Sequence, residues 1–451
     1  MIGTIGTYSY RNIWKVAYPI LISLVMEQMI GLTDTAFLGR VGEVELGASA
    51  IAIVYYMVLF MIGFGFSLGA QIIIGRRNGE GQYKETGKIF WNGLYFVLGL
   101  SGIIILLSEL FSPWLMKLMV SSSAIYDAAL SYVRWRLPGM VFAFITAMFR
   151  AFYIGTTQTK TLTLNSIVMV LSNVVFNYIL IFGKFGFRPM GVAGAAIATL
   201  VSRITECLFT VLYVLAVDKK LSLRLPAFFH TDRALRHDFF KYGIPIMAGQ
   251  LVWAVNMFSY SAIMGKLDYD GVIAALSVVG TLNSLSYIVM NGMSGAVGII
   301  TGKTIGSGKT EKIREYAYTV QILFLILGVL TGLLLQLLKD PFISLYSISD
   351  AAVTQSQNLI NVLSLTIVGT CYQAACLFGL VKSGGDVSFV MKNDAVFVFL
   401  IVVPSALLAA HLGAAPWLVF LFLKCDQILK CFVAAVKINR FHWMKNLTKT
   451  A

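Results

Sequence analysis

The chain has 451 residues, of which 58% are hydrophobic and only 12% are charged, roughly half the charged fraction of an average soluble domain. Several apolar runs exceed the length of about eighteen residues that is typical of a membrane-spanning helix. This composition excludes a soluble globular domain and indicates a polytopic helical membrane protein. The net charge of +14 would suit either a protein that binds nucleic acid or a membrane protein with basic loops, and the distribution of the basic residues along the chain distinguishes the two.

The apolar runs predict twelve membrane spans, six in each half of the chain. The first six cover residues 14–38, 46–75, 88–111, 127–153, 161–182 and 190–216. The second six cover residues 241–265, 271–302, 315–338, 352–381, 388–410 and 415–437. If the N-terminus is cytoplasmic, the loops on the opposite face hold few basic residues, namely Arg40, Lys117, Lys184, Arg188, Lys266 and Lys339. This asymmetry satisfies the positive-inside rule, predicts a cytoplasmic (inner) membrane protein with both termini cytoplasmic, and requires no nucleic acid.

The first predicted span carries two carboxylates, Glu27 and Asp34. A spacing of seven residues is close to two helical turns, so both project from one face, with Gly31 between them. A carboxylate at the centre of a membrane span costs about 2.5–3.5 kcal/mol on insertion scales, and such groups usually face a protein interior or a water-filled cavity. Both acids are therefore candidates for an ion or solute pathway. Asp34 is also near enough to the end of the span to reach the membrane surface.

The two halves of the chain repeat each other. Pro19 matches Pro245 at an offset of 226, and GFSLGAQIIIGRRNGEG (65–81) matches GMSGAVGIITGKTIGSG (292–308) at an offset of 227. Six spans per repeat is an even number, so the repeats share one orientation and imply a pseudo-twofold axis along the membrane normal. We expect an all-α fold of two six-helix lobes around a central cavity, formed by residues 1–216 and 241–451, with 217–240 as a cytoplasmic linker.

Several of these motifs resemble those of the multidrug and toxic compound extrusion (MATE) transporters. The resemblance rests on TDTAFLGRVGEVELGASAIA (33–52), on residues 65–81, on the NxxxN of the fifth span and on SGGD (383–386). It implies export of organic, often cationic, solutes in exchange for inward H⁺ or Na⁺. It also implies that Asp34 binds the coupling cation, with Asn173, Asn177 and Thr199 as its neighbours. No cofactor is expected beyond the coupling ion.

The residue types at these positions are suited to that role. Asn173 and Asn177 are four apart and present two amides from one face of an apolar helix. With Asp34 and Thr199 they could offer four or more oxygens to a hard cation such as Na⁺. The same groups could instead hydrogen-bond a protonated Asp34, or simply bridge packed helices, as Asn and Thr often do in membranes.

The second half departs from the family pattern. Some members carry a carboxylate in the seventh helix, where this chain has Gln250 and Trp253, which could line the cavity or simply pack. The tenth span contains no acid, and the nearest candidates for a cavity or substrate site are Asp386 and Asp394. We expect these two acids to be neutralised by the lysines nearest in sequence, Lys382 and Lys392. A second coupling site in this half is therefore doubtful.

The sequence predicts a cation-coupled exporter of small organic molecules that acts as a monomer in the lipid bilayer. The alternative is a flippase for lipid-linked or polysaccharide precursors, a class that resembles these transporters in its two-lobed architecture. Such flippases often have a strongly cationic cavity, whereas most basic residues of this chain fall in predicted loops. No catalytic constellation is recognisable, so an enzyme is not expected.

Overall fold

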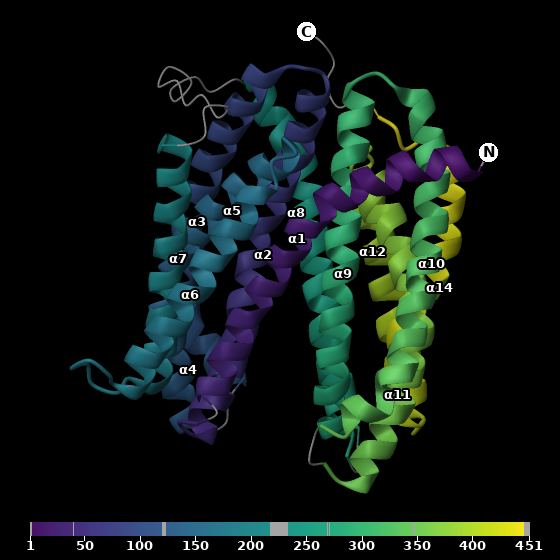
Figure 1. The fold of residues 1–451 in the computed structure, drawn as a ribbon. Helices are drawn as coiled ribbons and strands as arrows, with labels where there is room; N and C mark the ends of the chain where they lie inside the picture. Colours follow the sequence, from purple (N-terminus) through teal and green to yellow (C-terminus); the bar gives the residue numbers. More distant parts are fainter. Residues whose placement is uncertain are drawn as a thin grey trace. The chain divides into compact units, whose positions relative to one another are not determined.

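The computed structural model of the chain (Figure 1) describes residues 2–38, 40–119, 123–216, 233–267, 269, 271–345 and 348–445. Every regular element in these ranges is helical. The predicted class, an all-α polytopic membrane protein, is confirmed. The chain divides into two compact units, which we call the N-terminal unit (Ile22–Met247) and the C-terminal unit (Met1–Leu21 and Ala248–Ala451).

The N-terminal unit is built from the second part of α1 (Ile2–Leu38), six complete helices and the first part of α8 (Arg233–Gly265). The complete helices are α2 (Glu43–Gly79), α3 (Tyr83–Met119), α4 (Ser123–Arg136), α5 (Gly139–Gly155), α6 (Lys160–Phe182) and α7 (Gly191–Ala216).

The C-terminal unit contains the first part of α1, the second part of α8 and the rest of the chain. Its complete elements are α9 (Val272–Gly306), α10 (Thr310–Ile343), α11 (Asp350–Gln373), the π-helical η2 (Ala374–Val381), α12 (Val387–Val396), the π-helical η3 (Phe397–Val402), α13 (Val403–His411) and α14 (Pro416–Asn439). Two clusters of buried apolar side chains form its core, one around Leu359 and Phe420 and the other around Phe324 and Trp443.

Each predicted span corresponds to one helix or to two or three consecutive helices. Ten helices of the described chain are long and apolar enough to cross a membrane, and the bent pair α4 and α5 makes an eleventh candidate. The last predicted span, 415–437, corresponds to α14, which carries Lys424, Asp426, Lys430 and Lys437 and is not among these candidates. The helices therefore match the twelve predicted spans, although the spans differ in the number of charged residues that they carry.

The fourth predicted span differs from the expectation of one continuous helix over 127–153. It is bent by 49° between α4 and α5, at the dipeptide Leu137-Pro138. Proline has no backbone N–H and its ring clashes with the preceding turn, so a helix breaks at this position. The break leaves Arg136 as the last residue of α4. The carbonyl groups at a helix C-terminus lack intrahelical partners and favour a cation there.

Small residues bring α6 and α7 into close contact. A Cβ atom added at Gly194 would lie 2.7 Å from the backbone oxygen of Leu180, so only glycine permits this approach. Ala195, Ala196 and Ala198 continue the small, buried face of α7. Close helix packing through small residues is common in membranes. In this chain it brings the polar face of α6 next to Thr199.

The end of the described chain folds back onto the loop that follows η2. The Trp443 side chain is fully buried, and a Cβ atom at Gly384 would lie 2.2 Å from its ring. The backbone N–H of Lys445 donates to the carbonyl of Gly384 at 3.0 Å. We call this contact between residues 383–386 and 440–445 the C-terminal clasp.

The compact units do not follow the predicted linker. Residues 233–240, predicted as part of the linker 217–240, form the start of α8, and residues 217–232 lie outside the described part of the chain. The units instead divide within α1 and within α8, because α8 begins in close contact with α2. A Cβ atom at Gly69 would lie 2.9 Å from the Cα atom of Gly243.

Candidate functional site

The Asp34 carboxylate lies at the centre of a buried polar cluster in the N-terminal unit. Its side chain is 1% exposed, and Asn173 and Asn177 are completely buried. The Asn177 Nδ2 atom donates to Asp34 Oδ1 at 2.6 Å, and the Thr199 hydroxyl donates to Asp34 Oδ2 at 3.3 Å. The structure therefore brings the four predicted cation-site residues together from α1, α6 and α7.

The two asparagines are also bonded within the cluster. Asn177 Nδ2 donates to Asn173 Oδ1 at 3.0 Å, which is the contact expected for residues one helical turn apart. Asn173 Nδ2 donates to the Thr199 hydroxyl at 3.4 Å. Asn177 and Thr199 thus donate to the carboxylate, and Asn173 bonds to both of these donors.

One acceptor in this cluster is unused. The Asn177 Oδ1 atom is buried and has no hydrogen-bond partner, and such an atom costs free energy unless something pairs with it. Rotation of the Asn177 amide would turn this oxygen toward Asp34. The carboxylate, two amide oxygens and the Thr199 hydroxyl would then form an all-oxygen set, which suits a hard cation such as Na⁺. With the amide as it stands, the same cluster suits an ionised carboxylate.

The structure adds a residue to this cluster that the sequence analysis did not assign. Arg136, at the end of α4, places Nη1 at 3.8 Å from Asp34 Oδ2. Its guanidinium also donates a hydrogen bond to the hydroxyl of Tyr132 and lies over the rings of Tyr56 and Tyr132, at 4.6 and 5.3 Å from their centroids. The sequence feature that could have indicated this role is an arginine beside a proline in an apolar span, because a charged group inside a membrane needs a partner.

Glu27 has a different environment from Asp34. It is half-buried and forms an ion pair with Arg150 of α5. Arg203 and Glu206 of α7 pair at 3.0 Å. The spans of the N-terminal unit therefore hold several guanidinium groups, and those of Arg136, Arg150 and Arg203 each face a carboxylate. This qualifies the expectation that basic residues are confined largely to loops.

In the C-terminal unit the predicted neutralising partners are wrong. Asp394 pairs with Lys430 of α14 at 2.8 Å, not with Lys382 or Lys392. Lys430 also pairs with Asp426 at 3.0 Å, so one lysine bridges two buried carboxylates. Burial lowers the pKa of the Lys382 ammonium to about 8, against a smaller opposing effect of Asp394.

Asp386 belongs to the C-terminal clasp. It pairs with Lys437 at 2.7 Å and with Lys445 at 2.5 Å. Burial alone would raise the pKa of its carboxyl, but the two ammonium groups outweigh this effect and hold that pKa below its ordinary value. Because its carboxylate is paired with two lysines within the protein, Asp386 has the contacts of a structural residue.

Gln250 and Trp253 lie in the part of α8 that belongs to the C-terminal unit, and both side chains are partly exposed. They share no unit with Asp34. The described residues contain no group of three His, Cys, Asp or Glu side chains arranged to hold a metal ion.

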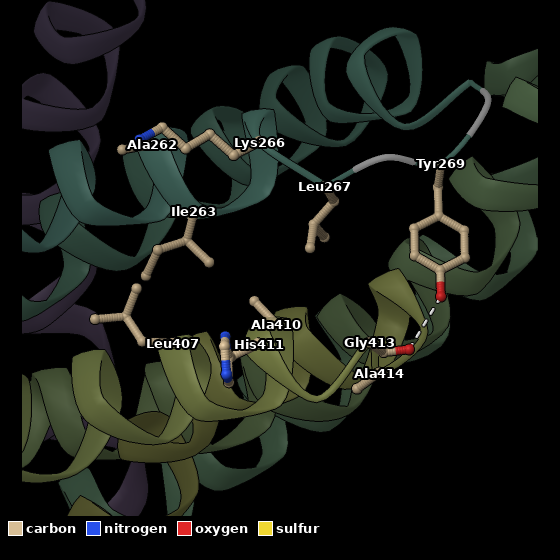
Figure 2. A pocket seen from close by; sticks show the side chains of 10 residues that line it. All are labelled: Ala262, Ile263, Lys266, Leu267, Tyr269, Leu407, Ala410, His411, Gly413 and Ala414. Atoms are coloured by element: carbon tan, nitrogen blue, oxygen red, sulfur yellow. Dashed lines mark hydrogen bonds between the residues drawn. The ribbon is translucent and has the colours of Figure 1, made fainter.

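A cavity of about 630 Å³ lies in the C-terminal unit, between the ends of α8 and α13; Figure 2 shows the side chains that line it. Its walls are mostly aliphatic, with Lys266 and His411 as the basic side chains. The Tyr269 hydroxyl closes one end by donating to the carbonyl of Gly413 at 3.1 Å. None of the predicted site residues lines this cavity.

Comparison with known proteins identifies what this chain is similar to. The family model described as MatE matches residues 19–179 and 245–408. A probable multidrug resistance protein NorM of Idiomarina loihiensis is 26% identical over 422 residues, which cover 91% of this chain and 88% of that protein. A protein of the same name from Thermotoga maritima is 25% identical over 77% of this chain and 74% of its own length. The crystal structure of a mutant of the Vibrio cholerae MATE transporter VcmN shares the fold, with a TM-score of 0.88, 16% identity and coverage of 98% of this chain and 99% of that one.

Proposed function

Because this chain belongs to the MatE family, we propose that it is a secondary antiporter that exports organic solutes, often cationic, in exchange for inward H⁺ or Na⁺. The family model spans both repeats of the chain. Two relatives that match most of its length are named as probable multidrug resistance proteins. We also propose that the protein acts as a monomer in the cytoplasmic membrane with both termini in the cytoplasm, as the distribution of basic residues indicates.

The observation that supports coupling is the buried Asp34 carboxylate with its exchangeable partners. Asp34 is almost fully enclosed by α1, α6 and α7, yet Asn177 Oδ1 beside it has no partner. A proton on Asp34 would exchange one acceptor for a donor, and a sodium ion would draw the amide oxygens toward the carboxylate. In both cases the site gains a positive charge and its hydrogen bonds rearrange. The same carboxylate could attract a cationic solute, so ion and solute would compete for it.

The energetics are adequate for such exchange. One elementary charge that crosses about 100 mV supplies about 2.3 kcal/mol. At about 1.4 kcal/mol per factor of ten, one charge could hold a neutral solute at a gradient of about fiftyfold. Exchange of one H⁺ or Na⁺ for a monovalent cation moves no net charge, so only the chemical gradient of the ion would drive it.

The flippase alternative gains no support from the guanidinium groups within the spans. Arg136, Arg150 and Arg203 each face a carboxylate within about 4 Å. A site for a pyrophosphate needs cations whose charge is not already compensated.

The test is uphill transport by the purified protein in proteoliposomes. Asp34→Asn keeps the side-chain volume and can still hydrogen-bond, but it cannot ionise. We expect this variant to fold and insert, and to lose ion-driven accumulation of a cationic dye. Asp340→Asn is the matched control, because Asp340 of α10 is solvent-exposed and accepts one hydrogen bond from Gln357. Comparison of Na⁺ and pH gradients identifies the ion. Wild-type accumulation by Asp34→Asn would refute the proposed site.

A further inference from the structure

Arg136 is held beside Asp34 by groups other than Asp34. Its guanidinium donates to the Tyr132 hydroxyl and lies over the rings of Tyr56 and Tyr132. Aromatic faces attract guanidinium groups, more strongly when water is excluded. Tyr56 is 8% exposed and Tyr132 is completely buried. These contacts would persist whether Asp34 is charged or neutral.

The contact between Arg136 and Asp34 is an ion pair without a direct hydrogen bond. At 3.8 Å, the nitrogen is beyond hydrogen-bonding distance. Both carboxylate oxygens remain bonded to Asn177 and Thr199 instead. Arg136 thus contributes its charge to the site and leaves the carboxylate oxygens to the residues that would coordinate an ion. In addition, Arg136 Nε is buried with no hydrogen-bond partner, so the guanidinium group does not use all of its donors.

The other arginines near this pair each form an ion pair with a glutamate. The Arg203 guanidinium of α7 acts electrostatically on Arg136 but is paired with Glu206. On α4 itself, Arg134 pairs with Glu109 of α3 at 3.9 Å, with both side chains about half exposed. The side chains that contact Asp34 from α6 and α7 are neutral. Arg136 is therefore the principal cation acting on Asp34.

We propose that Arg136 is a tethered counter-cation that neutralises Asp34 when no ion is bound and competes with the coupling ion for it. The inference rests on the proposed function of Asp34. A bare carboxylate is costly inside a membrane, and a tethered cation offsets part of that cost during the part of the cycle in which the site carries no ion. It also weakens ion binding, which allows the ion to leave.

The strength of this competition can be stated as a fold-change. An opposite charge at about 4–6 Å typically changes proton binding to a carboxylate by 10- to 1,000-fold. We expect Arg136→Met to bind the coupling ion at least tenfold more tightly than the wild type. Arg136→Lys, which keeps the charge, should remain closer to the wild type. Tyr132→Phe should have the opposite effect, because loss of the hydroxyl leaves Arg136 more dependent on Asp34 and so weakens ion binding.

The experiment measures ion binding by the purified full-length protein rather than transport. Binding of ²²Na⁺ reports the sodium affinity, and a pH titration of the infrared band of protonated carboxyl groups reports proton binding. The contribution of Asp34 is defined by subtracting the Asp34→Asn signal. Arg134→Met is the matched control, since it removes a neighbouring arginine of the same helix, and it should leave both signals unchanged.

The outcomes separate this inference from the proposed function. If Asp34→Asn leaves both signals intact, the proposed site is wrong and the inference falls with it. If Asp34→Asn abolishes a signal but Arg136→Met binds no more tightly than the wild type, only the counter-cation role is overturned. If Arg136→Met does not fold, Tyr132→Phe decides the question, and unchanged ion binding by that variant overturns the role.

Discussion

Replacement of Asp386 by asparagine removes the charge that two lysines share while it preserves the shape of the side chain. Asp386 is 4% exposed, and Lys437, at 2.7 Å, is about four-fifths buried. Removal of one partner from a buried ion pair typically costs about 3–5 kcal/mol. The Lys437 ammonium keeps its contact with the Phe389 ring at 4.1 Å, and the half-exposed Lys445 can turn to solvent. We therefore expect a loss near the lower limit, about 3 kcal/mol.

This loss is measurable as a change in thermal stability. The chain has five free cysteines, all buried or partly buried, so a thiol-reactive dye reports unfolding of the purified protein. For a chain longer than 250 residues, we expect roughly 1–2 °C per kcal/mol, or about 3–6 °C in total. Asp340→Asn, an exposed carboxylate in the same unit, should shift the melting temperature by less than about 1 °C. Equal shifts for the two variants would contradict the proposed contribution of the C-terminal clasp.

The pH dependence gives a second, independent check of Asp386. Its pKa lies below the ordinary value in the folded protein, so its contribution is fully present above the unfolded pKa of about 3.9 and is lost as the pH falls through the folded value. The difference in melting temperature between wild type and Asp386→Asn should therefore be constant from about pH 5 to pH 8. A difference that changed across this interval would show that the two lysines do not hold the carboxylate as described.

Three further predictions concern the N-terminal unit and the topology. Gly194→Leu should separate α6 from α7, because a Cβ atom there meets the Leu180 carbonyl at 2.7 Å. This variant should lose ²²Na⁺ or proton binding, whereas the control Gly99→Leu, at a position with open space, should preserve it. Glu27→Gln should lower the melting temperature by leaving Arg150 uncompensated, and Arg150→Met added to it should restore most of the loss; no recovery would mean that the pair does not stabilise the unit. Single cysteines at Phe185 and Lys309, in a background without the native cysteines, should react with an impermeant maleimide from opposite faces of the membrane, and labelling from one face would overturn the twelve-span topology.

The spans could be predicted from the sequence because a long apolar run has few alternatives to a membrane helix. The internal repeat could be predicted because glycine-rich motifs recur at a nearly fixed offset. The break before α5 is also marked in the sequence, by Pro138 in the middle of a predicted span. Asp34, Asn173, Asn177 and Thr199 lie together in the structure as the family resemblance implies, while their role in ion binding stays a prediction.

Ion-pair partners were the part that the sequence could not supply. Asp394 pairs with Lys430, which is 36 residues away, and Asp386 pairs with Lys437 and Lys445. Local spacing favoured Lys382 and Lys392, but helix packing and not proximity in sequence decides which charges meet. Arg136 was missed for the same reason, since it reaches Asp34 only because α4 ends beside α1.

The division of the compact units within α1 and α8 has a consequence for how the chain is assembled. The cuts fall after Leu21 and after Met247, two positions that are 226 residues apart, which is the offset of the internal repeat at Pro19 and Pro245. Each repeat thus contributes the beginning of its first helix to the unit built mainly from the other repeat. Two polypeptides obtained by cutting the chain between residues 217 and 232 would each carry a helix segment that completes the other. Neither fragment alone contains a complete compact unit, and each should need the other to regain the native fold. Such an exchange of equivalent helix segments is the arrangement of a domain-swapped dimer whose two subunits have been fused into one chain.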